Sequence, residues 1–439
     1  MRIIAIGIAL ALAAPATRAA RAQARPDPLD AEIDGRAASV LPQVVAWRRD
    51  IHAHPELSNR ETRTAALVAE QLRRLGLEVR TGVAHTGVVG VLRGGRPGRV
   101  VALRADMDAL PVTEEVDVPF VSHARATYNG QDVGVMHACG HDMHTAILMG
   151  VAEVLAGIKA QLPGTVLFIF QPAEEGAPAG EQGGAALMLQ EGAFDDPAPN
   201  AVFGLHVFSR IPAGRIDVRP GPLMAANETF RIVVHGRQTH GALPWRGTDP
   251  IVVASQIVLG LQTIISRQED ITLAPAVISV GSLQAGVRSN IIPDSAELVG
   301  TIRTFDAGMR AQIDERVRRT ATGIAQAAGA TADVTLTPGY VVTVNDSALT
   351  ARMLPTLRRV NGDAGVAVAQ LTTTAEDFSV YQQRVPGMYF FVGVTPPGAV
   401  MDTVAANHSP RFYADEAAIP VGLKAMAHLA VDYLRGSAR

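Results

Sequence analysis

Apolar residues in the first half of the chain follow two different spacings. Positions three and four residues apart predict helices in "SVLPQVVAWRRDIHAHPEL", which ends near Pro55, and in "TRTAALVAEQLRRLGLEV", which Gly76 stops. Short apolar runs predict buried strands in "RVVALRADMDALP", "TVLFIFQPAEEG" and "AVFGLHVF", with helices "HTAILMGVAEVLAGI" and "AALMLQEGAF" between them. Strands that alternate with helices predict an α/β fold, in which helices cover both faces of a mostly parallel sheet.

The pattern changes from about Pro222 onward. The strand-like runs "TFRIVVHGR", "AVISVGSLQAG", "SAELVGTIRTF" and "TADVTLTPGY" are interleaved with the helical runs "DPIVVASQIVLGLQTIIS" and "AGMRAQIDERVRRTATGIAQAAG". Strand–helix–strand–strand–helix–strand is the order of a ferredoxin-like α+β unit. After about Val341 the chain returns to helix and strand, with "GMYFFVGV" as an apolar strand. We therefore expect an inserted domain at residues 222–336, within a discontinuous α/β domain made of residues 25–221 and 337–439.

The N-terminus has the pattern of a secretory signal. In "MRIIAIGIALALAAPA" one positive charge precedes an apolar run too short to span a bilayer, and "AQA" at residues 22–24 fits a cleavage site. An uncleaved anchor or a misassigned start codon would give the same pattern. We expect residues 1–24 to be removed and the mature chain to be periplasmic or secreted, without stable membrane insertion.

Charge and cysteine content narrow the classes of function. The net charge of the 439 residues is −3, without the basic excess that nucleic-acid binding requires, so a nucleic-acid partner is not expected. Cys139 is the only cysteine, and it lies in "MHACGHDMH". In an oxidising compartment a lone cysteine cannot form an intramolecular disulfide, so its thiol is either inert and buried or a metal ligand.

Polar residues gather where the predicted strands end, which is where doubly wound sheets carry their sites. Each has an ordinary structural explanation when taken alone, but together they favour a metal site. Thiolate, imidazole and carboxylate groups suit zinc or another first-row dication. The candidate ligands are Cys139, His141, Glu175, His206 and His408. Five ligands exceed what one tetrahedral ion needs, which favours two divalent ions (Mn, Zn, Ni or Co) sharing the thiolate.

Residues beside these candidate ligands have separate expected roles. Asp142 and His144 are expected to be a helix cap and a helix-face residue. In an extended segment adjacent side chains point opposite ways, so Glu174 could face a water molecule while Glu175 binds metal. A carboxylate beside a metal site can take a proton from water and return it to a leaving amine. The expected reaction is metal-assisted hydrolysis of an amide.

Several motifs together resemble those of a known family. They are "RADMDALP", "MHACGHDMHTA", "QPAEEG", "GLHV", "GRQTHGALPWRGTDPI", "RSNIIPDSAELVGTIRTF", "TTTAEDFSVY" and "NHSPRFYADE". The chain resembles the amidohydrolase branch of the aminoacylase and carboxypeptidase G metallopeptidases, which includes hippurate hydrolase, N-acyl-amino-acid amidohydrolases and auxin-conjugate hydrolases.

The resemblance implies a di-metal catalytic domain with the five ligands above and an inserted lid domain that also dimerises. It implies that Glu174 is the general base and that Asp108 orients a ligand. Relatives with the more usual pattern have a histidine in place of Asp106 and a bridging aspartate where Cys139 serves here, which leaves metal identity open.

In the lid, the resemblance assigns substrate contacts to His240, Asn290 and Arg303. A guanidinium suits bidentate capture of a carboxylate. A strand-surface ion pair remains the alternative for Arg303, and a turn before "IIPD" remains the alternative for Asn290. Thr372, Thr373 and Thr374 precede "AEDF", and their hydroxyls could narrow or polarise an acyl pocket.

The expected function is hydrolysis of N-acyl amino acids to a carboxylic acid and an amino acid, by a homodimer or higher homo-oligomer. The alternatives are a dipeptidase or exopeptidase of the same family, separated by its preference for free-amine substrates, and a catalytically silent binding protein on this fold. A binding protein would not need a general base.

Overall fold

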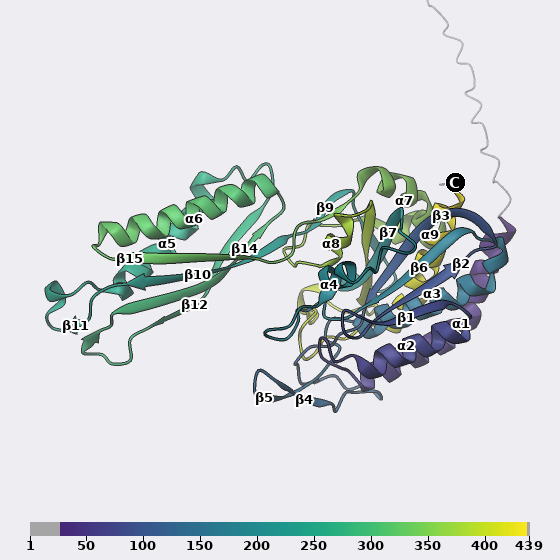
Figure 1. Ribbon diagram of the computed structural model, residues 1–439, viewed down its shortest axis with the longest axis horizontal. Coiled ribbons are helices and arrows are strands. Elements are labelled where there is room, and N and C mark those ends of the chain that lie inside the picture. Colours follow the sequence, from purple (N-terminus) through teal and green to yellow (C-terminus); the bar gives the residue numbers. More distant parts are fainter. Residues whose placement is uncertain (1–26, 437–439) are drawn as a thin grey trace, which may run out of the picture.

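The computed structural model describes residues 27–436, so the predicted signal segment lies outside the described residues (Figure 1). Its largest sheet has eight strands in the order β1-β2-β6-β3-β7-β18-β8-β17. The bounds are β1 Glu78–Val83, β2 Gly87–Arg93, β3 Arg96–Asp106, β6 Pro163–Gln171, β7 Ala201–Pro212, β8 Ile216–Val218, β17 Val366–Val368 and β18 Gly387–Thr395. The central strands β6, β3, β7 and β18 are parallel, and β1 and β2 add an antiparallel edge. The predicted mostly parallel sheet is confirmed.

Helices cover both faces of this sheet, as expected from the strand–helix alternation. One buried cluster joins the sheet to α1 (Pro28–Ala53), α2 (Thr62–Arg74), α3 (His141–Gly157), α7 (Ser347–Asn361) and α9 (Ile419–Arg435). A second cluster on the opposite face joins it to α4 (Gly184–Gln190) and α8 (Phe378–Gln382). Side chains alternate along each strand, so Leu103 of β3 lies in the first cluster and Ala102 in the second.

The first helix is longer than its apolar pattern predicted. It begins at Pro28, where the Asp27 carboxylate accepts a hydrogen bond from the Leu29 N–H at 3.0 Å. An acidic cap followed by proline at the first helical position is a favourable helix start. Pro42 lies inside the helix, and buried residues such as Ile33 and Val44 flank it on the core side.

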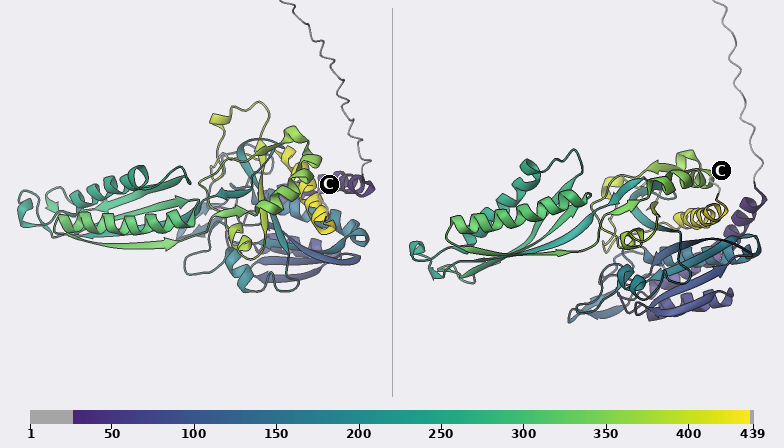
Figure 2. Two further views of the ribbon diagram at one scale, coloured as in Figure 1. Left: turned by 90° about the horizontal axis from the view of Figure 1, so that it is seen from above. Right: turned by 45° about the horizontal axis from the view of Figure 1, so that its top comes forward.

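A second, four-stranded sheet forms the lid domain, which extends away from the catalytic domain (Figures 1 and 2). Its antiparallel strands are in the order β12-β14-β10-β15. The bounds are β10 Ala226–His235, α5 Pro250–Gln268, β12 Ala276–Ala285, β14 Ser295–Thr304, α6 Ala307–Ala327 and β15 Thr331–Pro338. Both helices pack on one face of the sheet, so the ferredoxin-like order is confirmed. The exact domain boundaries at residues 222 and 336 stay a prediction.

Among residues 27–436, α5 alone has the length and apolar composition of a membrane-crossing helix. Its Ile257, Leu261 and Ile264 are buried in the lid core, as in a core helix of a globular domain.

The remaining strands are short. They are β4 Arg125–Tyr128, β5 Gln131–Gly134, β9 Gly221–Met224, β11 Thr239–His240, β13 Ile291–Ile292 and β16 Thr343–Asn345. The β4–β5 hairpin was not predicted from the sequence, although its turn is Asn129–Gly130, both with positive φ. Asn-Gly between two short runs is a strong hairpin signal.

Candidate metal centre

The five predicted ligands come together at the carboxyl ends of the central strands. Cys139 lies in the loop before α3, Glu175 in the turn after β6, and His206 within β7. His408 lies in the loop between β18 and α9, and His141 is the first residue of α3. Four of the five line a cavity of about 600 Å³, and His141 is fully buried beneath it.

The ligand atoms form two groups of three that share the thiol. One group is Cys139, His141 and His206, and the other is Cys139, Glu175 and His408; within each group the ligand atoms all lie within 4.8 Å of one another. The Cys139 Sγ is 3.4 Å from the His206 Nε2. The His408 Nε2 is 3.0 Å from the Glu175 Oε1. The residues of both groups therefore fit divalent cations held around the thiol.

The ring nitrogens of two histidines are oriented for metal binding. The His206 Nδ1 lies 2.7 Å from the Val207 carbonyl, which holds its proton there and leaves Nε2 free to face the thiol. The His141 Nδ1 lies 3.3 Å from the Asp108 Oδ1, and its buried Nε2 has no hydrogen-bond partner in the described structure. Buried polar atoms are nearly always paired, so this Nε2 suits a cation.

The charges at the centre also fit a cation. Burial alone would lower the pKa of His141, but the carboxylates of Asp106 and Asp108 raise it to about 10. The buried cluster therefore favours positive charge at this ring, which a divalent cation would supply in place of a proton. Burial and the neighbouring Glu175 raise the pKa of the Cys139 thiol well above its ordinary value. A bound cation reverses that preference and favours the thiolate.

Two further groups of potential ligands are already neutralised by Arg104. Its guanidinium lies 2.6 Å from the Asp106 carboxylate, 3.0 Å from Glu376 and 2.7 Å from Asp377. Arg104 is only 1% exposed, so the fixed positive charge is within the same buried network. A cation has little to gain beside it, so the two groups around Cys139 are better sites than these two.

His144 is likewise fully engaged. Its Nδ1 lies 2.5 Å from the Asp106 Oδ1, and its Nε2 accepts a hydrogen bond from the Val207 N–H at 2.8 Å. His144 therefore braces β7 next to His206 from its position on α3. The expected capping role of Asp142 is wrong: Gly140 is the N-cap, and the Asp142 carboxylate binds Arg48 and His52, each at 2.9 Å.

Gly140, between Cys139 and His141, has a φ of +94°. A Cβ built there would lie 2.2 Å from the Val207 Cγ2, so a side chain at this position would clash with β7. The tight glycine turn is what brings the thiol and the imidazole on either side of it to one centre.

Glu174 and Glu175 lie in a turn rather than in the extended segment assumed from the sequence. Ala173 has a φ of +54°, and the chain bends directly after β6. Both carboxylates therefore line the same cavity, and both form a possible ligand group with His141. Burial, together with the charges of Glu376 and Glu175, raises the pKa of Glu174 well above its ordinary value.

Two residues hold the backbone of this turn. The Asp108 carboxylate accepts hydrogen bonds from the N–H groups of Glu174 (3.1 Å) and Glu175 (3.0 Å), and from the Ser58 hydroxyl (2.8 Å). On the other side, the Tyr340 hydroxyl donates to the Glu174 carbonyl at 2.7 Å. Tyr340 follows β15, so it links the return from the lid to the site.

Three residues at the site, Arg104, Tyr340 and Asn407, were not predicted from the sequence. The Asn407 amide donates to the carbonyls of Cys139 and Val207, both at 3.1 Å, and so ties the His408 loop to the centre. A signal existed for Arg104, because a charged residue inside the apolar run "VVALRAD" needs buried partners. Tyr340 had no local signal, since its contact is set by tertiary structure.

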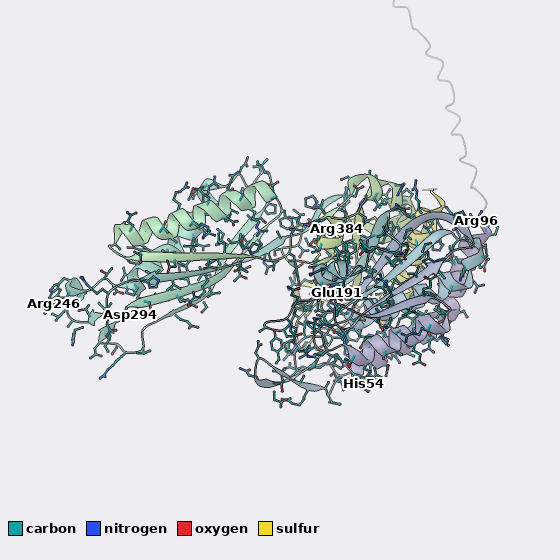
Figure 3. All side chains as sticks on the ribbon, viewed as in Figure 1. His54, Arg96, Glu191, Arg246, Asp294 and Arg384 are labelled. Atoms are coloured by element: carbon teal, nitrogen blue, oxygen red, sulfur yellow. The ribbon has the colours of Figure 1, made fainter. Side chains whose placement is uncertain are left out.

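The three predicted substrate-binding residues lie at opposite ends of the lid. Arg303 lines the cavity, is half-buried, and forms no ion pair within residues 27–436; burial lowers its pKa. His240 and Asn290 are exposed on neighbouring segments around β11 and β13. These segments lie at the far end of the lid, near Arg246 and Asp294 (Figures 1 and 3). Within this chain they do not reach the cavity.

The threonine run lies partly at the site. Thr372 and Thr374 line the cavity, with their hydroxyl oxygens 3.0 Å apart. Their influence on an acyl pocket stays a prediction.

A centre of this kind is typical of hydrolases that use divalent cations. The chain belongs to the peptidase family M20/M25/M40, whose family model matches residues 102–432.

Its relatives include hydrolases of several kinds. "Thermostable carboxypeptidase 2" of Saccharolobus solfataricus is 42% identical over 392 residues, covering 89% of this chain and 95% of that protein. "N-acetylcysteine deacetylase" of Bacillus subtilis is 37% identical over 390 residues, covering 89% and 96%. The solved structure of the Bacillus subtilis YXEP protein, described as a dinuclear metal binding peptidase, has a TM-score of 0.75 and 36% identity, covering 91% and 99%. Together these matches support metal-dependent amide hydrolysis.

Proposed function

We propose that this hydrolase cleaves the amide bond of N-acyl amino acids and releases a carboxylic acid and an amino acid. The observation that carries this proposal is the shared thiol: two groups of ligands meet at Cys139 beside the buried carboxylate of Glu174. The lid wall of the same cavity carries the guanidinium of Arg303, which forms no ion pair among the described residues and is a suitable partner for the substrate carboxylate.

Two divalent ions fit the residues present. Cys139, His141 and His206 would hold one, and Cys139, Glu175 and His408 would hold the other. Thiolate, imidazole and carboxylate ligands suit Mn, Zn, Ni or Co. When bound, such ions polarise a carbonyl and lower the pKa of water.

The chain's own residues would then position the substrate and move the proton. Glu174, whose pKa is raised, accepts a proton from water and passes it to the leaving amine. Asp108 holds the peptide N–H groups of Glu174 and Glu175 in place. Arg303 receives the carboxylate of the amino acid.

His240 and Asn290 would serve the site of a second copy of the chain, which favours a homodimer built through the lid. Val252 and Leu259 of α5 are 53% and 70% exposed, and β12 is an edge strand of the lid sheet. Exposed apolar residues and an unpaired strand edge suit contact with another chain. We also propose that the mature protein is exported, on the pattern of residues 1–24.

A dipeptidase or exopeptidase is the second candidate, favoured by the relative named as a carboxypeptidase. A panel of N-acyl amino acids and matched free-amine dipeptides would separate the two functions. Preference for the dipeptides would overturn the proposal.

Replacing the proposed base tests the mechanism. Glu174→Gln keeps the size of the side chain but removes proton transfer, so hydrolysis of N-acyl amino acids should fall by about 100-fold or more. Glu70→Gln, an exposed glutamate on α2, is the matched control. Metal content measured by elemental analysis should stay that of the wild type. Hydrolysis at the wild-type rate in Glu174→Gln would exclude Glu174 as the base.

A further inference from the structure

The cavity is lined by two arginines, one from each domain. Arg303 comes from β14 of the lid, and Arg210 comes from the end of β7 in the catalytic domain. Within residues 27–436, the Arg210 side chain forms neither an ion pair nor a hydrogen bond. The proposed function uses Arg303 alone, so the second guanidinium has no assigned role.

The backbone presents Arg210 in an unusual way. Its φ is +64°, a left-handed conformation that glycine adopts more readily than arginine. The pairing of β7 with β18 shifts register between Gly393 and Thr395, and the Arg210 N–H donates to the Thr395 hydroxyl at 3.0 Å. Such irregularities re-aim side chains next to active sites. Arg210 lines the cavity even though its left-handed backbone conformation is strained for any residue other than glycine.

The acidic residues of the cavity do not need Arg210 as a counter-ion. Glu175 pairs with His408 at 3.0 Å. Glu376 lies 3.0 Å from the Arg104 guanidinium and accepts a hydrogen bond from the Tyr389 hydroxyl at 2.7 Å. Glu174 is the proposed base. Arg210 is therefore available to a ligand.

We propose that Arg210 binds a second carboxylate of the substrate, so that the preferred substrates are dianionic N-acyl amino acids. This inference rests on the proposed function, in which Arg303 takes the carboxylate of the amino acid. Two guanidiniums on opposite domains suit an anion at each end of one molecule, because each can bind a carboxylate bidentately. A cavity of about 600 Å³ lies within the range of small-molecule sites and leaves room for the second acidic group.

The second carboxylate has two chemical sources. It can end the acyl group, as in a succinyl group, or end the side chain of the amino acid, as in glutamate. Substrates that differ only by an acid-to-amide change separate the two. N-succinyl-alanine is compared with N-succinamoyl-alanine, and N-acetyl-glutamate with N-acetyl-glutamine.

The experiment measures kcat/KM of the metal-loaded full chain for these four substrates and for N-acetyl-alanine. In the wild type, kcat/KM for the acid of at least one pair should exceed kcat/KM for the matching amide by about tenfold or more. A difference of this size is expected from the loss of a hydrogen bond to a charged group. In Arg210→Gln the acid-to-amide ratio of that pair should approach one, and Arg210→Lys should restore part of it. The pair that responds identifies the source of the carboxylate.

Arg384→Gln is the matched control, because Arg384 is also exposed and unpaired in the described structure but does not line the cavity. Its acid-to-amide ratios should equal those of the wild type. Arg210→Gly tests whether the Arg210 side chain has only a structural role. Because glycine suits the left-handed backbone, the melting temperature of this variant should be unchanged or higher, while its acid-to-amide ratio of kcat/KM should fall.

Hydrolysis of N-acetyl-alanine without an acid preference in either pair would overturn the role of Arg210 and leave the proposed function standing. A preference that survives in Arg210→Gln would also overturn it. Failure of the wild type to hydrolyse any of the five substrates would overturn both proposals.

Discussion

The hydrogen bond from Tyr340 to the turn that carries Glu174 can be removed without disturbing other groups. Tyr340→Phe deletes only the hydroxyl, which donates to the Glu174 carbonyl at 2.7 Å. The peptide N–H of Glu174 would still be held by Asp108 at 3.1 Å. The carboxylate would therefore stay at the cavity but lose one of the two bonds that fix its backbone.

The expected size of the effect follows from that single bond. A neutral hydrogen bond contributes about 0.5–1.5 kcal/mol net. Since about 1.4 kcal/mol corresponds to a tenfold change in rate, kcat should fall by about twofold to tenfold. The phenyl ring remains in the cavity wall, so KM should change by less than about twofold.

Steady-state kinetics on an N-acyl amino acid would measure kcat and KM separately, with the melting temperature recorded alongside. Tyr381→Phe is the control: Tyr381 is fully buried, and its hydroxyl has no hydrogen-bond partner in the described structure. An unchanged kcat in Tyr340→Phe would refute the reasoning. A raised KM with unchanged kcat would mean that the hydroxyl contacts the substrate instead.

Four further outcomes are expected. Asp108→Asn should lower kcat/KM and metal affinity by about tenfold to 100-fold, as loss of a residue that orients a ligand does. Kinetics with a metal titration would check this prediction, and an unchanged metal affinity would contradict it. Treatment with a chelator should abolish turnover, and added Mn or Zn should restore it. Activity that persists with no detectable metal would contradict metal-dependent hydrolysis. Although burial opposes it, Asp142 and Glu114 raise the pKa of His52. The stabilising effect of protonated His52 is therefore complete below about pH 6.5 and is lost as pH rises through the raised pKa. In urea titrations, the difference in unfolding free energy between the wild type and His52→Gln should shrink from about pH 6 to about pH 9. A difference that stays constant over this range would contradict the prediction. Leu259→Asp should shift the protein toward monomer in light scattering, and an unchanged mass would argue against the lid contact.

Much of the fold was predictable because the periods of apolar residues differ between helices and strands. The runs at β3, β6 and β7 and the helix at α3 were found where the pattern put them. The glycine that ends α2 was also recognisable: Gly76 has a φ of +74°. Proximity of Cys139, His206 and His408 followed from their position at strand ends and loops of one sheet.

Other features depend on tertiary contacts that no local pattern carries. Asp142 lies in the first turn of α3, and its sequence position suggested a cap, but its carboxylate pairs with Arg48 on α1 instead. The turn at Ala173 replaced the assumed extended chain, because Asp108 gathers the two peptide N–H groups that follow. His240 lies at the far end of the lid because β10 starts at the cavity beside Arg303 and runs away from it before the chain reaches His240, a direction that the local sequence does not show.

The connections between the domains have a mechanical consequence. The chain enters the lid at Asn227 and leaves it at Tyr340, and these residues bond to each other through their backbones. Arg303 pairs with Asn227 in the lid sheet, close to this pivot, whereas β11, which carries His240, lies at the far end of the lid (Figure 1). A rotation about the pivot displaces each residue in proportion to its lever arm. A rotation of the lid by a few degrees would therefore leave Arg303 nearly stationary over the cavity but move His240 over a much longer path.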